Sequence, residues 1–111
     1  MRNMSFSETT QQVLDRTKTV TRRLGWENLK PGELIQAIEK GQGLKKGEKV
    51  RRLCVLRIVS NQRERLDAIR KRDCRLEGFP EHSPREFVRM FCRLNCCEVW
   101  QMVNRIEFEY A

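Results

Sequence analysis

A stretch of nine residues near the start of the chain, Asp15–Arg23, holds the residue types that could do chemistry together. It carries four cations and three hydroxyls but only one apolar side chain, Val20. A segment of this make-up has little to bury, so its polar groups are expected to face a site, and the cations would make that site positive. The pattern leaves open whether the site holds nucleic acid, a small nucleoside or only water.

Further cations could extend such a site into a basic cleft with a charged rim. Besides the cations of the stretch, the candidate binding residues are Trp26 and three lysines, so that the full set is Arg16, Lys18, Arg22, Arg23, Trp26, Lys30, Lys45 and Lys46, with Lys49 nearby. Contacts from such groups to phosphates would give salt-dependent, weakly sequence-selective affinity. The Trp26 ring could stack on a base if it is exposed, or it could close the core as a lid.

The overall composition fits one globular domain spanning residues 1–111. Hydrophobic residues make up 39% of the chain, which is too many for wholesale disorder. The formal net charge of +8 favours polyanionic partners such as RNA, DNA or phosphorylated small molecules. No apolar run approaches the roughly 20 residues that span a bilayer, so we expect no membrane segment.

The cysteines indicate a reducing compartment. Their number, five, is odd, and the first residues do not resemble a secretory leader, so we expect a cytoplasmic protein with free thiols. Cys92, Cys96 and Cys97 lie close together, with His82 upstream. Adjacent cysteines suit a single zinc ion poorly. We therefore expect neither a metal nor another cofactor.

The pattern of apolar and turn residues along the rest of the chain predicts an α+β domain. A short strand is expected to end at Phe6, and further strands are expected over residues 18–24, 34–39, 51–61 and 106–110. One helix is expected to end near residue 15, a second to span residues 66–72 and a third to start at residue 84. Ser83, Pro84 and Glu86 form a capping box with proline at the first helical position. Because the strands mostly neighbour one another in sequence, we expect a mostly antiparallel sheet that closes toward a small barrel.

Several stretches resemble the ASCH-domain family, a branch of the PUA-like superfamily. The family signature G-x-K-x-x-x-x-R falls on Arg16, Lys18 and Arg23, of which the last two match. A glycine at position 16 would suit a positive φ or a close approach to a ligand. The resemblance continues through residues 29–35, 76–79, 83–87 and 105–108. It implies a small β-barrel with helices over its openings and a cleft beside the first helix. It also implies a function related to RNA.

One branch of this family resembles amidohydrolases that remove the acetyl group of N4-acetylcytidine. That branch uses a lysine, a threonine three residues later and a distant glutamate, which Lys18, Thr21 and Glu77 match. The resemblance implies that Thr21 attacks the acyl carbon while Lys18 takes its proton. Such a lysine needs a lowered pKa. Glu77 would then protonate the departing nitrogen.

Regular strand geometry opposes this assignment, because Lys18 and Thr21 would point to opposite faces of one strand. They can converge only if Lys18 precedes the strand or a bulge intervenes. Three functions therefore remain open: recognition of RNA or a modified nucleoside, hydrolysis of N4-acetylcytidine, and an interaction module whose cleft is vestigial. Glu77 could also be only a structural ion-pair partner. Nothing in the sequence sets the oligomeric state.

Overall fold

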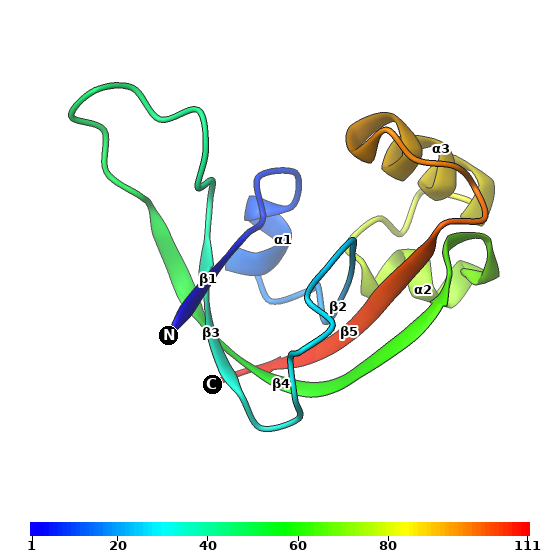
Figure 1. The fold of residues 1–111 in the computed structure, drawn as a ribbon, viewed down its shortest axis with the longest axis horizontal. Coiled ribbons are helices and arrows are strands. Elements are labelled where there is room, and N and C mark those ends of the chain that lie inside the picture. The colour runs from blue at the N-terminus through cyan, green and yellow to red at the C-terminus, as the bar shows by residue number, and fades with distance from the viewer.

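The computed structural model describes residues 1–111, which form one five-stranded sheet, three α-helices and a short 3₁₀ turn (Figure 1). In chain order the elements are β1 (Arg2–Ser5), α1 (Thr10–Leu14), β2 (Val20–Arg23), β3 (Leu34–Ile38), β4 (Arg52–Arg65), η1 (Leu66–Ala68), α2 (Lys71–Leu76), α3 (Pro84–Asn95) and β5 (Met102–Tyr110). The predicted α+β class is confirmed.

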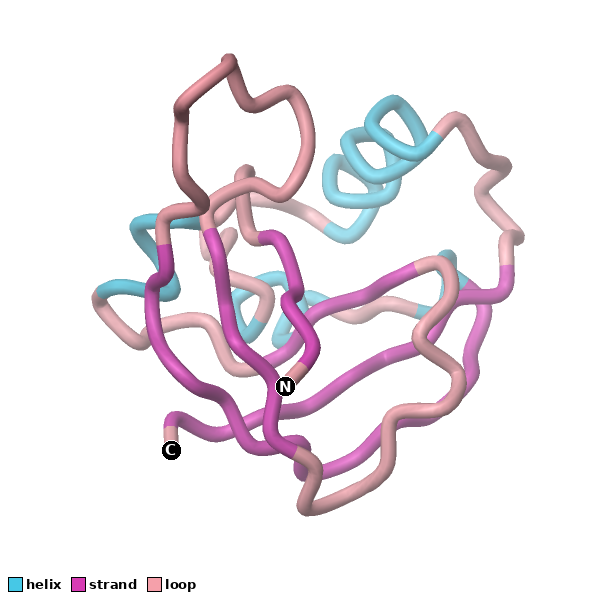
Figure 2. The backbone as a smooth tube through the Cα atoms, turned by 60° about the vertical axis from the view of Figure 1, so that its left-hand side comes forward, coloured by secondary structure: helices cyan, strands magenta, loops and turns pink.

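The sheet is curled but open, with strand order β1-β3-β4-β5-β2. Strands β1 and β3 are parallel, whereas the other three pairs are antiparallel. The mostly antiparallel, barrel-like architecture is thus confirmed, with one parallel pair and without full closure. Strands β4 and β5 bend through the whole molecule (Figure 1 and Figure 2). Their register shifts between Ile58 and Ser60. Such a bulge increases local bending and twist.

Two strands are longer than their apolar patterns indicated. Strand β4 continues past residue 61 to Arg65, and β5 begins at Met102 rather than at 106. The added halves pair with each other, since Gln62 lies opposite Arg105 and Arg65 opposite Met102. Backbone hydrogen bonding extends the strands here although most side chains of this part of β4 are polar and exposed.

The helix predicted over 66–72 is wrong, because the chain breaks it in two. Residues Ile69 and Arg70 have extended backbone between the 3₁₀ turn and α2. The Asp73 carboxylate accepts a hydrogen bond from the Arg70 backbone N–H at 3.0 Å, which starts α2 at Lys71. The later start carries α2 on to Leu76 and places Glu77 at its carboxyl end.

Two separate hydrophobic clusters support the sheet. The larger cluster fills the curl of the sheet and includes Phe6, Val13 and Phe108. The second packs η1, α2 and α3 against the far end of β5 through residues such as Leu66, Phe87 and Phe91. Helix α3 begins as predicted, since the Glu86 N–H donates to the Ser83 hydroxyl at 3.1 Å. None of the helices has the length and apolar character needed to cross a bilayer.

Candidate functional site

A cleft of about 280 Å³ lies where the sheet fails to close. The two edge strands, β1 and β2, contribute Ser5 and Thr21–Arg23 to its walls, and α3 contributes Phe87 and Phe91. Lys18 and Glu77 line the same cleft. Helix α3 stands over this opening (Figure 1). The open edge of the sheet therefore provides a space that a closed barrel would have filled.

Lys18 and Glu77 form a buried ion pair in the cleft wall. The Lys18 Nζ donates to Glu77 Oε1 at 2.9 Å and to the Glu77 backbone carbonyl at 2.7 Å. Each side chain is only 3% exposed. Burial lowers the pKa of Lys18, and the negative charge of Glu77 offsets only part of that effect. Lys18 precedes β2, so strand alternation does not separate its side chain from that of Thr21.

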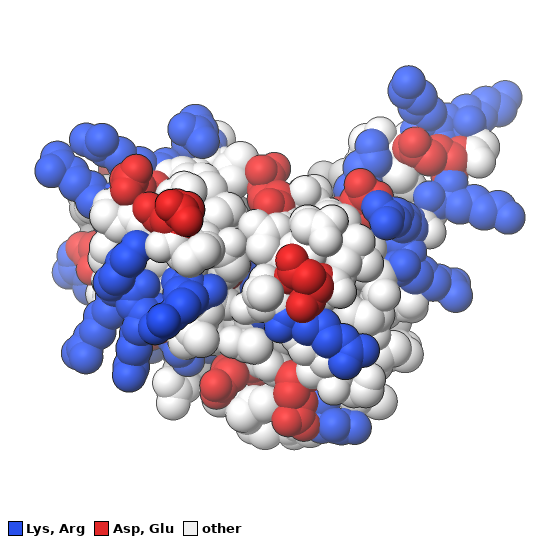
Figure 3. All heavy atoms as spheres, turned by 180° about the vertical axis from the view of Figure 1, so that it is seen from behind, with Lys and Arg blue, Asp and Glu red and all other residues white.

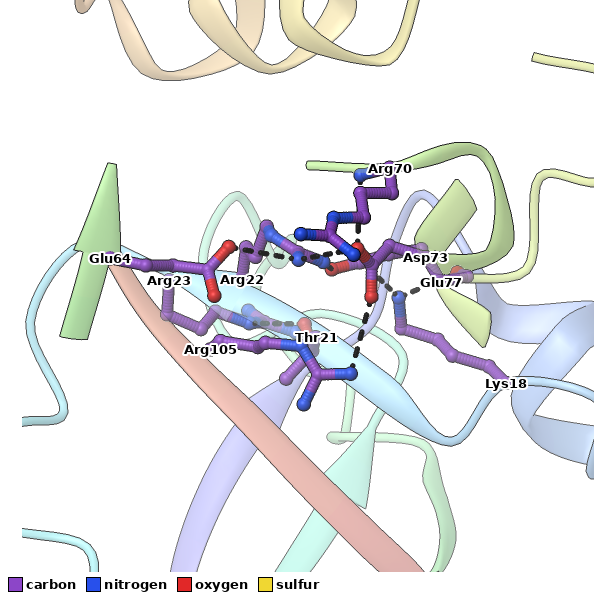
Figure 4. A network of polar contacts seen from close by, with 9 residues as sticks. All are labelled: Lys18, Thr21, Arg22, Arg23, Glu64, Arg70, Asp73, Glu77 and Arg105. Atoms are coloured by element: carbon purple, nitrogen blue, oxygen red, sulfur yellow. Dashed lines mark hydrogen bonds and ion pairs between the residues drawn. The ribbon is translucent and has the colours of Figure 1, made fainter. Parts of the chain in front are cut away.

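Arg22 holds the other oxygen of the same carboxylate. Its Nη1 donates to Glu77 Oε2 at 2.9 Å and its Nη2 to Glu64 Oε2 at 3.1 Å, while Asp73 lies 3.5 Å away. Burial opposes the charge on Arg22, but these carboxylates outweigh it and raise the pKa of the guanidinium. The Arg22 Nε is buried without a hydrogen-bond partner. Arg22 is thus a fixed cation that orients Glu77 (Figure 4).

Asp73 extends this network to the last strand. Its Oδ1 accepts from Arg105 Nη2 at 3.2 Å (Figure 4). Burial would raise the pKa of Asp73, but the Arg70 N–H and the charge of Arg22 outweigh burial and lower it. Glu64, Asp73 and Arg105 were missed as site-supporting residues. The capping role of Asp73 in the first turn of α2 could have been predicted from the sequence, whereas nothing in the sequence connects Glu64 to position 22.

Arg23 bridges the gap between the two edge strands. Its Nε donates to the Thr21 hydroxyl at 3.0 Å, and its Nη2 donates to the Ser5 backbone carbonyl at 2.6 Å. The guanidinium also lies 4.8 Å from the centre of the Phe6 ring. Burial lowers the pKa of Arg23 to about 10. This one side chain therefore ties β2 to β1 across the open side of the sheet.

The remaining candidate residues do not line the cleft. Arg16 is exposed, with its guanidinium 5.4 Å from the Tyr110 ring, and it does not plug the cleft. Its φ of 63° is the left-handed conformation that a glycine would favour. The Tyr110 hydroxyl donates to the Lys18 backbone carbonyl at 2.6 Å, so this contact supports the turn before β2. Burial raises the pKa of Tyr110 to about 12.

The other predicted rim residues are spread along the molecule. Lys30 precedes β3, whereas Lys45 and Lys46 follow it on the β3–β4 loop, so they lie at opposite ends of that strand. Trp26 is partly buried against the larger hydrophobic cluster and does not line the cleft. Figure 3 shows Lys and Arg gathered most densely on the two flanks of the molecule rather than in one continuous rim. No group of three metal-ligating side chains comes together.

The comparisons with known proteins place the fold. No family model and no curated protein matches the sequence. Among solved structures, a DUF984 protein from Enterococcus faecalis V583 matches with a TM-score of 0.67 and 14% identity, over 99% of this chain and 79% of that one. An ASCH domain from Lactobacillus crispatus JV V101 matches with a TM-score of 0.64 and 13% identity, over 98% of this chain and 78% of that one.

These likenesses define the class of structure. The chain is an α+β domain with an open, curled five-stranded sheet and a cleft at its gap. It has the fold of an ASCH domain, as the resemblance in its sequence implied. At sequence identities of 13% and 14%, these likenesses show the fold alone, so the function must be argued from the residues of the cleft.

Proposed function

We propose that the domain recognises a single nucleoside, free or presented by RNA, in the cleft between β1, β2 and α3. The observation that carries this proposal is the pairing of two unlike walls. One wall is polar and fixed, with Lys18, Thr21 and Glu77, and the other is aromatic, with Phe79 and Phe87 among its members. A nucleobase has flat apolar faces and a polar edge, so it matches both walls.

The polar wall offers both kinds of hydrogen-bonding partner to a base edge. Two hydrogen bonds engage the Lys18 ammonium, which leaves its third N–H to donate. The Thr21 hydroxyl accepts from Arg23 and keeps its own proton for a ligand acceptor. The Glu77 carboxylate holds lone pairs beyond those used by Lys18 and Arg22, and these can accept from an exocyclic amine. Preorganised groups of this kind lower the entropy cost of binding.

The size of the cleft limits the ligand. Its volume of about 280 Å³ lies at the lower end of ordinary small-molecule sites. A duplex cannot enter such a space, so an RNA ligand must present an unpaired nucleotide, as in a loop, a bulge or a strand end.

Calorimetric titration with cytidine, uridine, adenosine, guanosine and N4-acetylcytidine tests this proposal. We expect at least one nucleoside to bind, and Thr21→Val to weaken that binding about tenfold through loss of one hydrogen bond. Thr10→Val is the matched control, because the Thr10 hydroxyl also bonds within the protein but lies outside the cleft. Absence of binding for the whole panel at millimolar concentration would refute nucleoside recognition.

Hydrolysis of N4-acetylcytidine is the second candidate, favoured by the lowered pKa of Lys18 beside Thr21 and Glu77 in one cleft. The Lys18 proton would first pass to Glu77 within the ion pair. Thr21 Oγ1 would then bond to the acetyl carbon, Lys18 would take the hydroxyl proton, and the protonated Glu77 would donate to N4 as the C–N bond breaks. Water, deprotonated by Glu77, would release acetate and restore Thr21 with the proton from Lys18. The hydrogen bond from Arg23 to Thr21, and the ion pair that occupies Lys18, favour binding over catalysis.

Acetate release from N4-acetylcytidine distinguishes the two candidates. Catalysis predicts release by the wild type that is lost in Lys18→Ala and in Thr21→Ala. If the wild type binds N4-acetylcytidine but releases no acetate at high enzyme concentration, the hydrolase proposal fails and nucleoside recognition stands.

A further inference from the structure

A second hollow of about 600 Å³ adjoins the cleft on the other side of Arg23. The two spaces share three wall residues: Ser5, Ser7 and Arg23. The adjoining hollow is completed by residues that include Asn3, Trp26, Lys40 and Gln42. A ligand seated in the cleft can therefore continue past Arg23 into this space.

The two spaces differ in charge. The cleft is lined by Lys18, Arg22 and Arg23 but also by the carboxylates of Glu8 and Glu77. The walls of the adjoining hollow carry two cations, Arg23 and Lys40, and no carboxylate, and the nearest carboxylate partner of Lys40 is the exposed Glu48 at 3.9 Å, outside the hollow. An anionic part of a ligand is therefore favoured in the hollow, whereas an uncharged part suits the cleft.

Arg23 is placed to contact a ligand on both sides. Its Nε and Nη2 are bonded to Thr21 and Ser5. The third nitrogen, Nη1, makes no hydrogen bond within the protein and is not one of the fully buried atoms left without a partner, so its N–H groups remain able to donate to a ligand. A guanidinium held rigidly by two bonds, with a free N–H, is well suited to bind a phosphate oxygen.

Trp26 supplies an aromatic surface to the adjoining hollow in an unusual backbone conformation. Its φ is 68°, which is rare for a bulky residue. Asn61 Nδ2 donates to the Trp26 carbonyl at 2.8 Å and helps to hold this conformation. The Arg2 guanidinium lies 4.2 Å from the centre of the ring. Strained positions of this kind are often kept where they aim a functional group.

We propose that the ligand of the cleft is a nucleotide within a single RNA strand, with a flanking phosphate at Arg23 and Lys40 and the neighbouring base beside Trp26. This inference rests on the proposed function, since it assigns the nucleoside to the cleft. Aromatic stacking joined to cations along the backbone is the usual chemistry of single-strand binding.

Titrations with the tightest-binding nucleoside, its monophosphates and an RNA trinucleotide centred on it test this inference at low salt. We expect the trinucleotide to bind at least tenfold more tightly than the nucleoside, with the monophosphates between them. Lys40→Gln should weaken trinucleotide binding several-fold and reduce the slope of log affinity against log salt concentration by about one. The same substitution should leave the nucleoside affinity unchanged. Lys30→Gln makes the same charge change outside both spaces and should alter neither.

Tryptophan fluorescence gives an independent readout. In a Trp100→Phe variant the emission comes from Trp26 alone. We expect the trinucleotide to quench it and the nucleoside to leave it unchanged. A trinucleotide that binds no better than the nucleoside, no better than the monophosphates, or equally well to Lys40→Gln overturns the inference while nucleoside recognition stands. If neither nucleoside nor trinucleotide binds, the proposed function falls as well.

Discussion

The cations of the cleft and those of the β3–β4 loop are the same residue types in opposite physical settings. Lys18 is buried and lies 2.9 Å from its carboxylate partner, with both side chains 3% exposed. On the loop, Lys40 and Glu48 are 3.9 Å apart and 47% and 39% exposed. A buried charge must be paired with good geometry because desolvation is costly. An exposed pair contributes about 0–1 kcal/mol.

The difference shows why net charge alone does not locate a site. Exposed lysines attract any polyanion over a distance of about a Debye length, and salt screens that attraction. The buried cations instead fix the orientation of Glu77 and Thr21, so they can distinguish one ligand from another. We therefore expect changes in the cleft to affect stability and selectivity, and changes at loop residues that line neither space, such as Lys45 and Lys46, to affect only salt-dependent attraction.

The largest expected effect comes from removing the charge that Lys18 and Arg22 share. Glu77→Gln leaves two buried cations without their common partner, and we expect the free energy of unfolding to fall by about 3–5 kcal/mol. Urea denaturation measures this change. Glu109→Gln is the control, because the Arg57–Glu109 pair is exposed and its loss should cost no more than about 1 kcal/mol. Equal losses of unfolding free energy in the two variants would contradict the difference between the buried and the exposed ion pair.

Acid should weaken the same network through Asp73. Its pKa in the folded protein lies below the ordinary 3.8. The unfolded chain therefore takes up this proton more readily, so the stabilisation is complete above pH 3.8 and is lost as pH falls through the folded-state pKa. We expect Asp73→Asn to flatten the decline in urea midpoint with falling pH. An unchanged acid slope in the variant would exclude Asp73 as a cause.

A smaller effect is expected at Arg16, an exposed cation whose backbone matters more than its charge. At a φ of 63° we expect Arg16→Gly to be about 1 kcal/mol more stable than Arg16→Ala, because only the latter keeps a Cβ in the left-handed region. At Arg89, inside α3, we expect Arg89→Ala to be more stable than Arg89→Gly by a similar amount. Thermal or urea unfolding of the four variants decides this.

The smallest effect is expected on the loop itself. Replacing Lys45 and Lys46 together by Gln should change the free energy of unfolding by less than about 0.5 kcal/mol, since both side chains are exposed. Nucleoside affinity should stay unchanged, and any loss of RNA affinity should vanish at high salt. A loss of nucleoside affinity would mean that the loop reaches the cleft.

Local chemistry in the sequence predicted much of this arrangement. The capping box at Ser83 fixed the start of α3, and the hydrophobic pattern gave the order of the elements. The matches at Lys18, Thr21 and Glu77 fall in one cleft, because Lys18 lies before β2 as the alternation argument required. The left-handed backbone at Arg16 likewise agrees with a position where glycine would be favoured.

Long-range contacts were not predictable in the same way. Arg22 was expected among the cations that contact a ligand, yet its side chain is fully buried and paired with carboxylates of distant elements, Glu64 and Asp73. The added part of β4 is polar and mostly exposed, so it carries no hydrophobic pattern, and backbone pairing with β5 extends it. Trp26 was expected to stack on a base or to close the core, and Lys30 to join the basic rim, because both follow the basic stretch in sequence. Neither residue lines the cleft.

The position of Arg23 as the wall between the two spaces has a consequence for how preference for a ligand can diversify. Substitution of Gln42 or Asn3 reshapes only the hollow, and substitution of Phe79 or Met90 reshapes only the cleft. Two compartments that have only Ser5, Ser7 and Arg23 in common can thus be retuned independently. Related chains could keep the same central residue while exchanging its neighbours one at a time.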